Sequence, residues 1–144
     1  MGGIVLRTYL QTHTLPNLGR VVMLAPPNQG SEVVDKLGWF PPFAWFNGPA
    51  GLQLGTNPES LPNRLPPPSF ELGVIAGDRT INPLLSVLIP GKDDGKVSQA
   101  RVQTTGMKDF IILHVTHTFM MRNSHVIAQT MHFLKTGLFQ KSEK

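Results

Sequence analysis

The sequence contains no cysteine, which excludes disulfide bonds, thiolate metal sites and a cysteine nucleophile. Charged residues are also scarce: they make up 15% of the 144 residues, against about a quarter in an average globular domain. No apolar run reaches the roughly 18 residues of a transmembrane helix, so no integral membrane segment is expected. The formal net charge is +4, but the basic residues are scattered from Arg7 to Lys144 without a basic stripe, so nucleic-acid binding is not expected.

What the sequence does contain is typical of a folded domain. Apolar residues make up 40% of the chain, and its 14 glycines and 13 prolines favour long irregular loops over disorder. We expect residues 1–144 to form a portion of one domain, with an insertion at 38–69. This insertion is rich in proline and aromatic residues, so it should not carry a long helix or a central strand. It either covers core or forms a lid or wall over an apolar substrate pocket.

Three short apolar runs bounded by turn residues predict fully buried β-strands, at residues 20–25, 71–77 and 109–115. Helical segments and the insertion separate these runs along the chain. The order of the elements predicts the α/β class, with a parallel sheet and flanking helices joined by crossover connections. We expect the three strands to lie side by side in chain order.

Helices are predicted at both ends of the chain and after the first strand. The first should begin at residue 1 or before it, and a short helix capped by Ser31 should follow the first strand. The last should span residues 126–136, with Asn123 or Ser124 as its cap and Gly137 closing it. The side chains expected on the buried faces of the first and last helices are Ile4, Val5, Tyr9, Leu10, Ile127, Met131 and Leu134.

Ionisable side chains follow the predicted strands at their carboxyl ends, the edge where a parallel sheet gathers its ligands. His117 lies two residues beyond the third strand, and Asp93 and Asp94 lie in the loop that precedes that strand. A carboxylate and an imidazole from neighbouring loops can act as an orienting acid and a general base. Asp94 is preferred because it directly precedes Gly95, in a sharp turn that can hold a carboxylate forward.

The other candidate groups favour structural roles. Ser31 and Ser98 lack the Gly-x-Ser-x-Gly context of a nucleophile and are interpreted as cap or turn residues. Asp78 should fix its own turn, and His114 should face the core or the sheet surface. No other histidine forms a ligand pair with His117 by its position, so we expect neither a metal site nor another cofactor.

Four segments resemble motifs of the α/β-hydrolase superfamily, in its lipase and carboxylesterase branch. Residues 1–5, Met-Gly-Gly-Ile-Val, resemble the end of the nucleophile elbow in the form Gly-His-Ser-Met-Gly-Gly. Residues 24–31 resemble the segment after the family's sixth strand. Residues 93–98 resemble the acid loop, and residues 114–118 resemble the loop that carries the catalytic histidine. The acid and the histidine follow each other in the family's order.

The resemblance implies a serine-hydrolase-type esterase acting on apolar or acyl carboxylic esters. Asp94 would orient the imidazole, His117 would be the general base, and a serine would form the acyl-enzyme. That serine would stand directly before Met1, whose backbone N–H would be one oxyanion-hole donor. We therefore expect a partial α/β-hydrolase fold, the C-terminal half with its three C-terminal strands, which as given lacks its nucleophile and its activity.

Partners and location follow from the same expectation. The first strand would have a free edge, so we expect self-association as a homodimer through that edge, unless the aromatic segment at 39–46 covers it. The sequence does not determine the cellular compartment, because any export signal would lie in the missing half, and the cytoplasm is taken as the default. The competing interpretation is a non-catalytic protein that uses the same half-fold to bind a partner. An in-frame Gly-x-Ser in the DNA directly before Met1 would distinguish the two.

Overall fold

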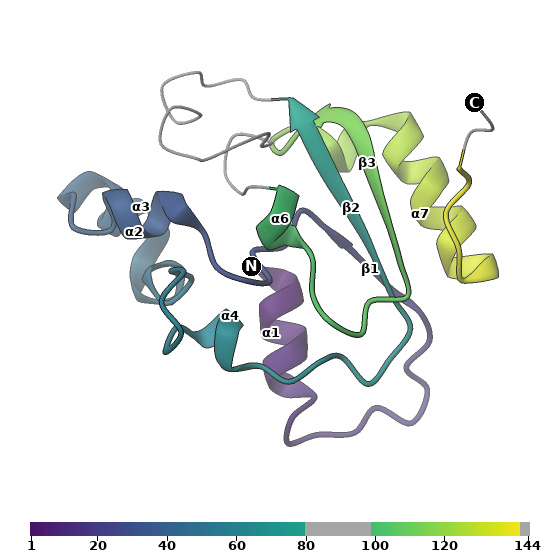
Figure 1. The fold of residues 1–144 in the computed structure, drawn as a ribbon, viewed down its shortest axis with the longest axis horizontal. Helices are drawn as coiled ribbons and strands as arrows, with labels where there is room; N and C mark the ends of the chain where they lie inside the picture. The colour runs from purple at the N-terminus through teal and green to yellow at the C-terminus, as the bar shows by residue number, and fades with distance from the viewer. Residues whose placement is uncertain (80–98, 142–144) are drawn as a thin grey trace.

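The computed structural model describes residues 1–79 and 99–141, and Figure 1 shows one sheet with helices packed around it. The apolar run at 83–89, which begins with Pro83 and predicts a short helix or turn, lies outside these residues. In the described ranges, no helix is both long and apolar enough to cross a membrane. Along the chain the elements are α1 (Gly2–Tyr9), β1 (Val21–Leu24), α2 (Glu32–Leu37), α3 (Pro41–Leu52), α4 (Leu61–Arg64), β2 (Leu72–Arg79), α6 (Gln99–Val102), β3 (Asp109–Thr116), the 3-10 helix η1 (Met120–Arg122) and α7 (Ser124–Thr136).

The three strands form one parallel sheet in the order β1-β2-β3, which confirms the α/β prediction and its strand order. Val21 of β1 pairs with Leu72 of β2, and Gly73 of β2 pairs with Asp109 of β3. The central strand β2 is buried over its first six residues. The prediction of full burial is wrong for the two outer strands: among the described residues β1 and β3 each pair with β2 alone, and Leu24 of β1 and Ile112 of β3 are exposed.

Helix α7 covers one face of the sheet, and α1 and α6 lie on the other (Figure 1). Ile75 and Phe133 belong to the buried cluster on the α7 face, and Met23 and Val102 belong to the cluster on the opposite face. Helix α1 approaches the sheet closely, since a Cβ on Gly3 would lie only 2.6 Å from the sulfur of Met23. Because successive side chains of a strand point to opposite faces, the sheet contributes buried side chains both to the α7 face and to the face covered by α1 and α6.

The ends of α7 are as predicted. The Asn123 side-chain oxygen accepts hydrogen bonds from the backbone N–H groups of His125 at 2.9 Å and Val126 at 3.2 Å, so Asn123 is the N-cap. At the other end Gly137 has φ +84°, the left-handed conformation that suits glycine at a helix C-terminus. Both helix limits could therefore be read from cap residues.

The buried face of α7 is not the predicted one. Ile127, Met131 and Leu134 are 40–50% exposed, whereas Val126, Gln129 and Phe133 are buried. The prediction from the spacing of apolar residues failed because a polar side chain, Gln129, is buried on this face of α7. Gln129 is accommodated by two hydrogen bonds of 2.9 Å with the backbone of Gln140, one donated and one accepted.

Helix α1 also turns a different face to the core. Ile4 is buried as expected, but Val5 is 60% exposed and Tyr9 is 45% exposed. Arg7 is buried in their place. The interior side of this helix faces segments that offer hydrogen-bond acceptors to the guanidinium, so an arginine replaces part of the apolar stripe.

The insertion is more helical than predicted. It carries α3 and the short α4, but α3 is broken at Gly48 into two short stretches, so the expectation that the insertion holds no long helix agrees with the structure. Pro41 and Pro42 occupy the first turn of α3, where backbone N–H groups have no helical partner and proline costs little. Gly48, with φ +65°, interrupts the helix directly before Pro49, so this proline starts a second helical stretch after a kink.

A smaller difference concerns the end of β2. Asp78, which was expected to fix a turn, lies within the strand, because β2 continues to pair with β3 as far as Arg79 and Thr116. The register shifts between Gly77 and Arg79. Asp78 therefore projects from a strand and does not fix a turn.

Candidate active site

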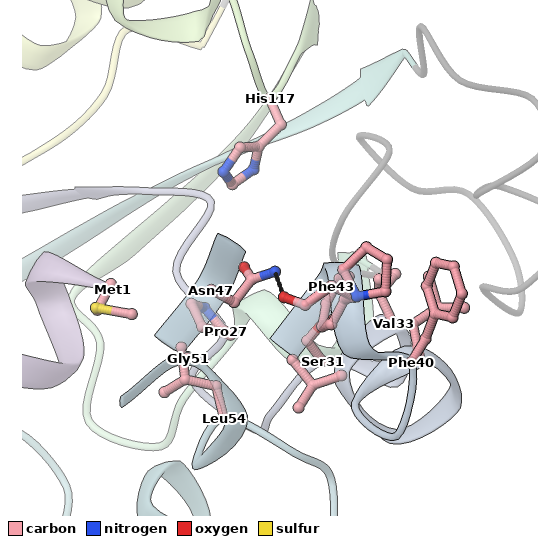
Figure 2. Close-up of a pocket in the computed structure, with 13 residues that line it drawn as sticks. Met1, Pro27, Ser31, Val33, Phe40, Phe43, Asn47, Gly51, Leu54 and His117 are labelled. Atoms are coloured by element: carbon pink, nitrogen blue, oxygen red, sulfur yellow. Dashed lines mark hydrogen bonds between the residues drawn. The ribbon is translucent and has the colours of Figure 1, made fainter. Parts of the chain in front are cut away.

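A cavity of about 710 Å³ lies at the carboxyl ends of the strands, between the body of the fold and the insertion. Figure 2 shows His117 on one side of it, Met1 on another, and residues of α2 and α3 across from both. The loop after β1, through Pro27 and Ser31, and the loop after β3, through His117, both contribute to the lining. The described lining residues are Met1, Pro27, Ser31, Val33, Val34, Leu37, Phe40, Pro42, Phe43, Asn47, Gly51, Leu54 and His117.

His117 follows directly on β3, which ends at Thr116. The pairing of β3 with the buried strand β2 fixes this end of β3, so the base of the His117 loop is held by the sheet. In Figure 2 the imidazole points toward the other lining residues. Asp93 and Asp94, the predicted acids, lie outside the described residues, as does Ser98.

Met1 is the N-cap residue of α1, and its carbonyl accepts hydrogen bonds from Ile4 at 2.9 Å and Val5 at 3.2 Å. The start of a helix carries a partial positive charge, which stabilises negative charge that develops nearby. Met1 and His117 line one cavity from two different elements. In a reaction that forms an oxyanion, an imidazole at this cavity can act as general base, and the helix N-terminus can stabilise the negative charge.

The loop after β1 forms the floor of the cavity and is anchored by a buried network. The Arg7 guanidinium donates to the Asn28 side-chain oxygen and to the carbonyls of Leu65 and Pro66, each at 3.1 Å. Asn28 in turn donates to the carbonyl of Val102 at 2.8 Å. Burial lowers the pKa of Arg7 from its usual value. The network ties α1, the loop beneath the cavity, the insertion and α6 into one unit.

Sequence reasoning missed this network. Arg7 interrupts an apolar run three residues after Ile4, and an arginine on the buried side of a helix needs several acceptors. The position of Arg7 within this run was the sign in the sequence that its side chain is buried and hydrogen-bonded. Its partners could not be identified, because Asn28 is 21 residues away and the Leu65 and Pro66 carbonyls are 58 and 59 residues away.

Ser31 is the N-cap residue of α2, as predicted, but its side chain makes no capping hydrogen bond. It is buried and lines the same cavity as His117. Its backbone N–H donates to the carbonyl of Leu54 at 2.8 Å, which joins the start of α2 to the segment just after α3 in the insertion. Gly30 permits this approach, because a Cβ there would lie 2.1 Å from the carbonyl oxygen of Gly55.

The insertion supplies apolar walls to the cavity. Phe40, Phe43 and Asn47 lie at helical spacing along α3 or just before it and line the cavity. The Asn47 side-chain amide donates to the carbonyl of Phe43 at 2.8 Å, so this polar group is satisfied within the helix. Trp39 and Trp45 are 78% and 86% exposed and do not line the cavity.

A carboxylate–imidazole pair lies outside the cavity. Asp78 Oδ1 and His114 Nδ1 are 2.8 Å apart, across the neighbouring strands β2 and β3. The His114 side chain is 73% exposed, which agrees with the predicted position on the sheet surface. Neither residue lines the cavity, so this pair does not share a binding volume with Met1 and His117.

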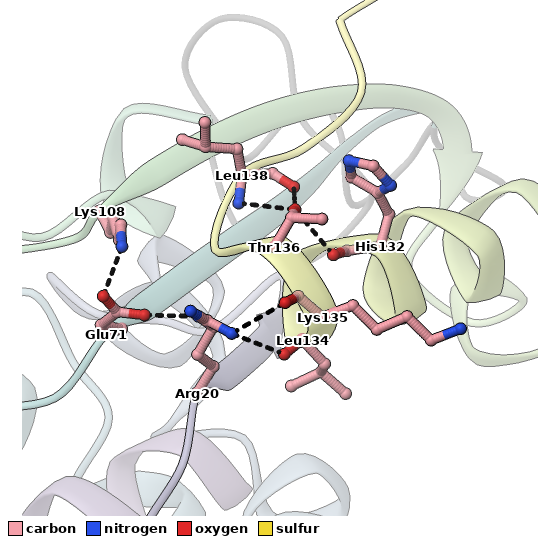
Figure 3. Close-up of polar contacts among 8 residues, drawn as sticks. All are labelled: Arg20, Glu71, Lys108, His132, Leu134, Lys135, Thr136 and Leu138. Atoms are coloured by element: carbon pink, nitrogen blue, oxygen red, sulfur yellow. Dashed lines mark hydrogen bonds and ion pairs between the residues drawn. The ribbon is translucent and has the colours of Figure 1, made fainter.

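The opposite end of the sheet carries the main charge cluster, which Figure 3 shows. Glu71 accepts from Arg20 at 2.5 Å and also pairs with Lys108. Hydrogen bonds from Lys108 and then from Arg20 hold the pKa of Glu71 below its usual value. Arg20 also donates to the carbonyls of Leu134 and Lys135 at 3.1 Å, at the C-terminal end of α7. Among the described residues, no group of three or more His, Asp or Glu side chains could hold a metal ion.

The sequence matches no family model, and no curated protein matches it significantly. Among solved structures, the fold is similar to that of a Bacillus licheniformis lipase in its propeptide form, with a TM-score of 0.58 and 15% sequence identity. The match covers 88% of this chain and 31% of the lipase, so the chain spans less than a third of that protein's length. The fold is therefore lipase-like, an α/β arrangement with a parallel sheet.

Proposed function

We propose that the cavity is the acyl-binding part of a serine-hydrolase-type site that acts on carboxylic esters. One observation carries the proposal: His117 and Met1 line the same cavity, which apolar side chains of the insertion enclose. The lipase-like fold supports it. A base and a backbone N–H at a helix start are two of the groups that acyl transfer requires.

In the proposed reaction, His117 removes the proton of a serine hydroxyl while the serine oxygen attacks the ester carbonyl. The Met1 N–H stabilises the oxyanion, and the alcohol leaves with the proton from His117. His117 then takes a proton from water, whose oxygen attacks the acyl-enzyme; the bond from the acyl carbon to the serine oxygen breaks, the carboxylic acid leaves, and His117 returns the proton to the serine. Asp94 would orient the imidazole, and the serine would directly precede Met1. Residues 1–144 would then be the C-terminal half of the domain and inactive by themselves.

The lining of the cavity favours an apolar acyl group as the substrate. None of its described lining residues is Asp, Glu, Lys or Arg, and most are aliphatic, aromatic or proline. A sugar or a phosphate would lose hydration in such a cavity without gaining enough hydrogen bonds or charge pairs. The volume of about 710 Å³ is within the range of cavities that bind drug-sized ligands.

The test starts with the DNA upstream of Met1, which should encode an in-frame Gly-x-Ser directly before it. Residues 1–144 should give no adduct with a fluorophosphonate probe by intact mass, whereas the longer chain should be labelled on that serine. In the longer chain, His117→Ala should reduce turnover by several orders of magnitude, as loss of a triad base does elsewhere.

The matched control is His114→Ala, because His114 also pairs with a carboxylate but lies outside the cavity. This variant should keep its labelling and its turnover. An upstream sequence without Gly-x-Ser, an adduct on Ser31 or Ser98, or equal losses in the two histidine variants would contradict the proposal.

A further inference from the structure

Asn47 is the polar side chain of the wall that α3 contributes to the cavity. Its amide nitrogen donates to the Phe43 carbonyl at 2.8 Å, within the same helix. This bond fixes the orientation of the amide, because a carbonyl can accept a hydrogen bond from the nitrogen but not from the amide oxygen. The oxygen Oδ1 therefore points away from Phe43, and it accepts no hydrogen bond from any described residue.

The surroundings of Asn47 leave this oxygen accessible to a ligand. Asn47 lies across the cavity from His117 (Figure 2). Gly51, four residues later, makes room for the amide, since a Cβ on Gly51 would lie 2.8 Å from the Asn47 Cβ and 3.8 Å from Oδ1. A longer chain would not cover this wall, because the serine of the proposed function would join Met1, on a different side of the cavity.

An acceptor of this kind discriminates between ligands that are otherwise alike. A ligand that fills the cavity displaces water from Oδ1, so a ligand without a donor leaves the oxygen unpaired, whereas a donor restores the lost hydrogen bond. A cationic donor would lose its own hydration, and none of the described lining residues is an Asp or Glu that would balance its charge. A hydroxyl group is a neutral donor with little polar surface to desolvate.

We propose that Asn47 binds a hydroxyl group of an otherwise apolar ligand, so that the substrate is an ester whose acyl group carries a hydroxyl away from the ester bond. The hydroxyl lies far from the ester bond because Asn47 and His117 are on opposite sides of the cavity. The substrate assignment rests on the proposed function. The hydroxyl site itself does not, since it needs neither a serine nor turnover.

The experiment measures how the chain binds two isomers of equal composition, 1-decanol and methyl nonyl ether, by displacement of N-phenyl-1-naphthylamine. Only the alcohol can donate a hydrogen bond. Asn47→Leu removes Oδ1 and keeps a side chain of similar size. The ratio of the alcohol affinity to the ether affinity should fall by about three- to tenfold in this variant, the loss expected for one hydrogen bond.

The matched control is Phe43→Leu, which alters the same wall and keeps the carbonyl that holds Asn47. It should weaken the binding of both isomers alike and leave the ratio unchanged. Asn47→Ala removes the same oxygen with a residue of high helix propensity, so it should repeat the result of Asn47→Leu. An unchanged ratio in both Asn47 variants, or an equal fall of the ratio in Phe43→Leu, would overturn the proposal.

The hydroxyl site and ester hydrolysis can fail separately. A longer chain without the serine would contradict hydrolysis and leave the result with the two isomers standing. In a longer chain that hydrolyses esters, Asn47→Leu should lower kcat/KM for 4-nitrophenyl 10-hydroxydecanoate three- to tenfold more than for 4-nitrophenyl decanoate, by the same hydrogen bond. Equal losses on the two esters would overturn the assignment of a hydroxylated substrate.

Discussion

The two ends of the parallel sheet use ionisable side chains in opposite ways. At the amino end, Arg20, Glu71 and Lys108 neutralise one another and the C-terminal carbonyls of α7, partly in contact with water (Figure 3). At the carboxyl end, His117 is the one ionisable side chain among the described residues that line the cavity (Figure 2). The amino end therefore holds the layers together, whereas the carboxyl end places an imidazole beside space that a ligand can occupy.

If this division is correct, substitutions at the amino end should change stability and leave the cavity intact. The largest effect is expected for Phe133→Ala. Phe133 is fully buried, its ring centroid lies 4.8 Å from that of Phe139, and the missing side chain of Gly73 makes room for it. Removing the ring should lower the free energy of unfolding by about 3–5 kcal/mol in urea denaturation.

The neighbouring Leu134→Ala is the matched control for Phe133→Ala. Leu134 is 40% exposed, so its truncation should cost about 1 kcal/mol or less. Similar losses in the two variants would show that α7 does not pack as described, and the amino end would lose its assigned role.

Asp109, at the start of β3, is the next largest contributor at this end. One carboxylate oxygen accepts from the Phe110 N–H and the other from the Phe139 N–H, both at 2.8 Å, and Lys141 lies 3.2 Å away. Burial by itself raises the pKa of Asp109, but the two backbone hydrogen bonds and Lys141 outweigh it, so the pKa is below its usual value. The ionised carboxylate thus joins the C-terminal segment to the sheet.

Because the folded-state pKa of Asp109 is lowered, its contribution to stability is present above the unfolded-state pKa of about 3.9 and is lost as pH falls through the folded-state value. Asp109→Asn should cost about 1–3 kcal/mol near pH 7, since one amide N–H must then face the Asn side-chain nitrogen. The difference between wild type and variant should narrow below about pH 4 in urea titrations. A difference that stays constant down to pH 2 would contradict this role of the carboxylate.

A feature of the fold can be predicted from the sequence when the residues that determine it lie close together in the chain. The strands and the caps of α7 depend on short apolar runs and on Asn123 and Gly137, so they were predicted to within a few residues. The buried faces of α1 and α7 depend on Arg7 and Gln129, polar side chains whose partners lie elsewhere in the chain. Apolar periodicity cannot identify such positions, because it treats every polar side chain as exposed.

The candidate site shows the same limit. His117 could be singled out because it directly follows an apolar strand, and Met1 because its neighbours resemble a known motif. The walls of the cavity could not, since the prolines of the insertion argued against a long helix and gave no sign of the short one that carries Phe43. Pro41 and Pro42 lie in the first turn of α3 and Pro49 lies after the kink at Gly48, and such positions become apparent only when the helix limits are known.

The smallest expected effect tests the carboxyl end directly. Phe43→Ser removes an aromatic wall of the cavity, while the Phe43 carbonyl that Asn47 uses is kept. Binding of the neutral apolar dye N-phenyl-1-naphthylamine, followed by fluorescence, should weaken roughly tenfold, because the lost contact corresponds to about 1.4 kcal/mol. Trp45→Ser on the same helix removes a larger ring that is 86% exposed and lines no part of the cavity, so the dye affinity should not change. If Trp45→Ser weakens binding as much as Phe43→Ser, the dye binds the exposed aromatic surface, and the carboxyl end is not the ligand-binding end of the sheet.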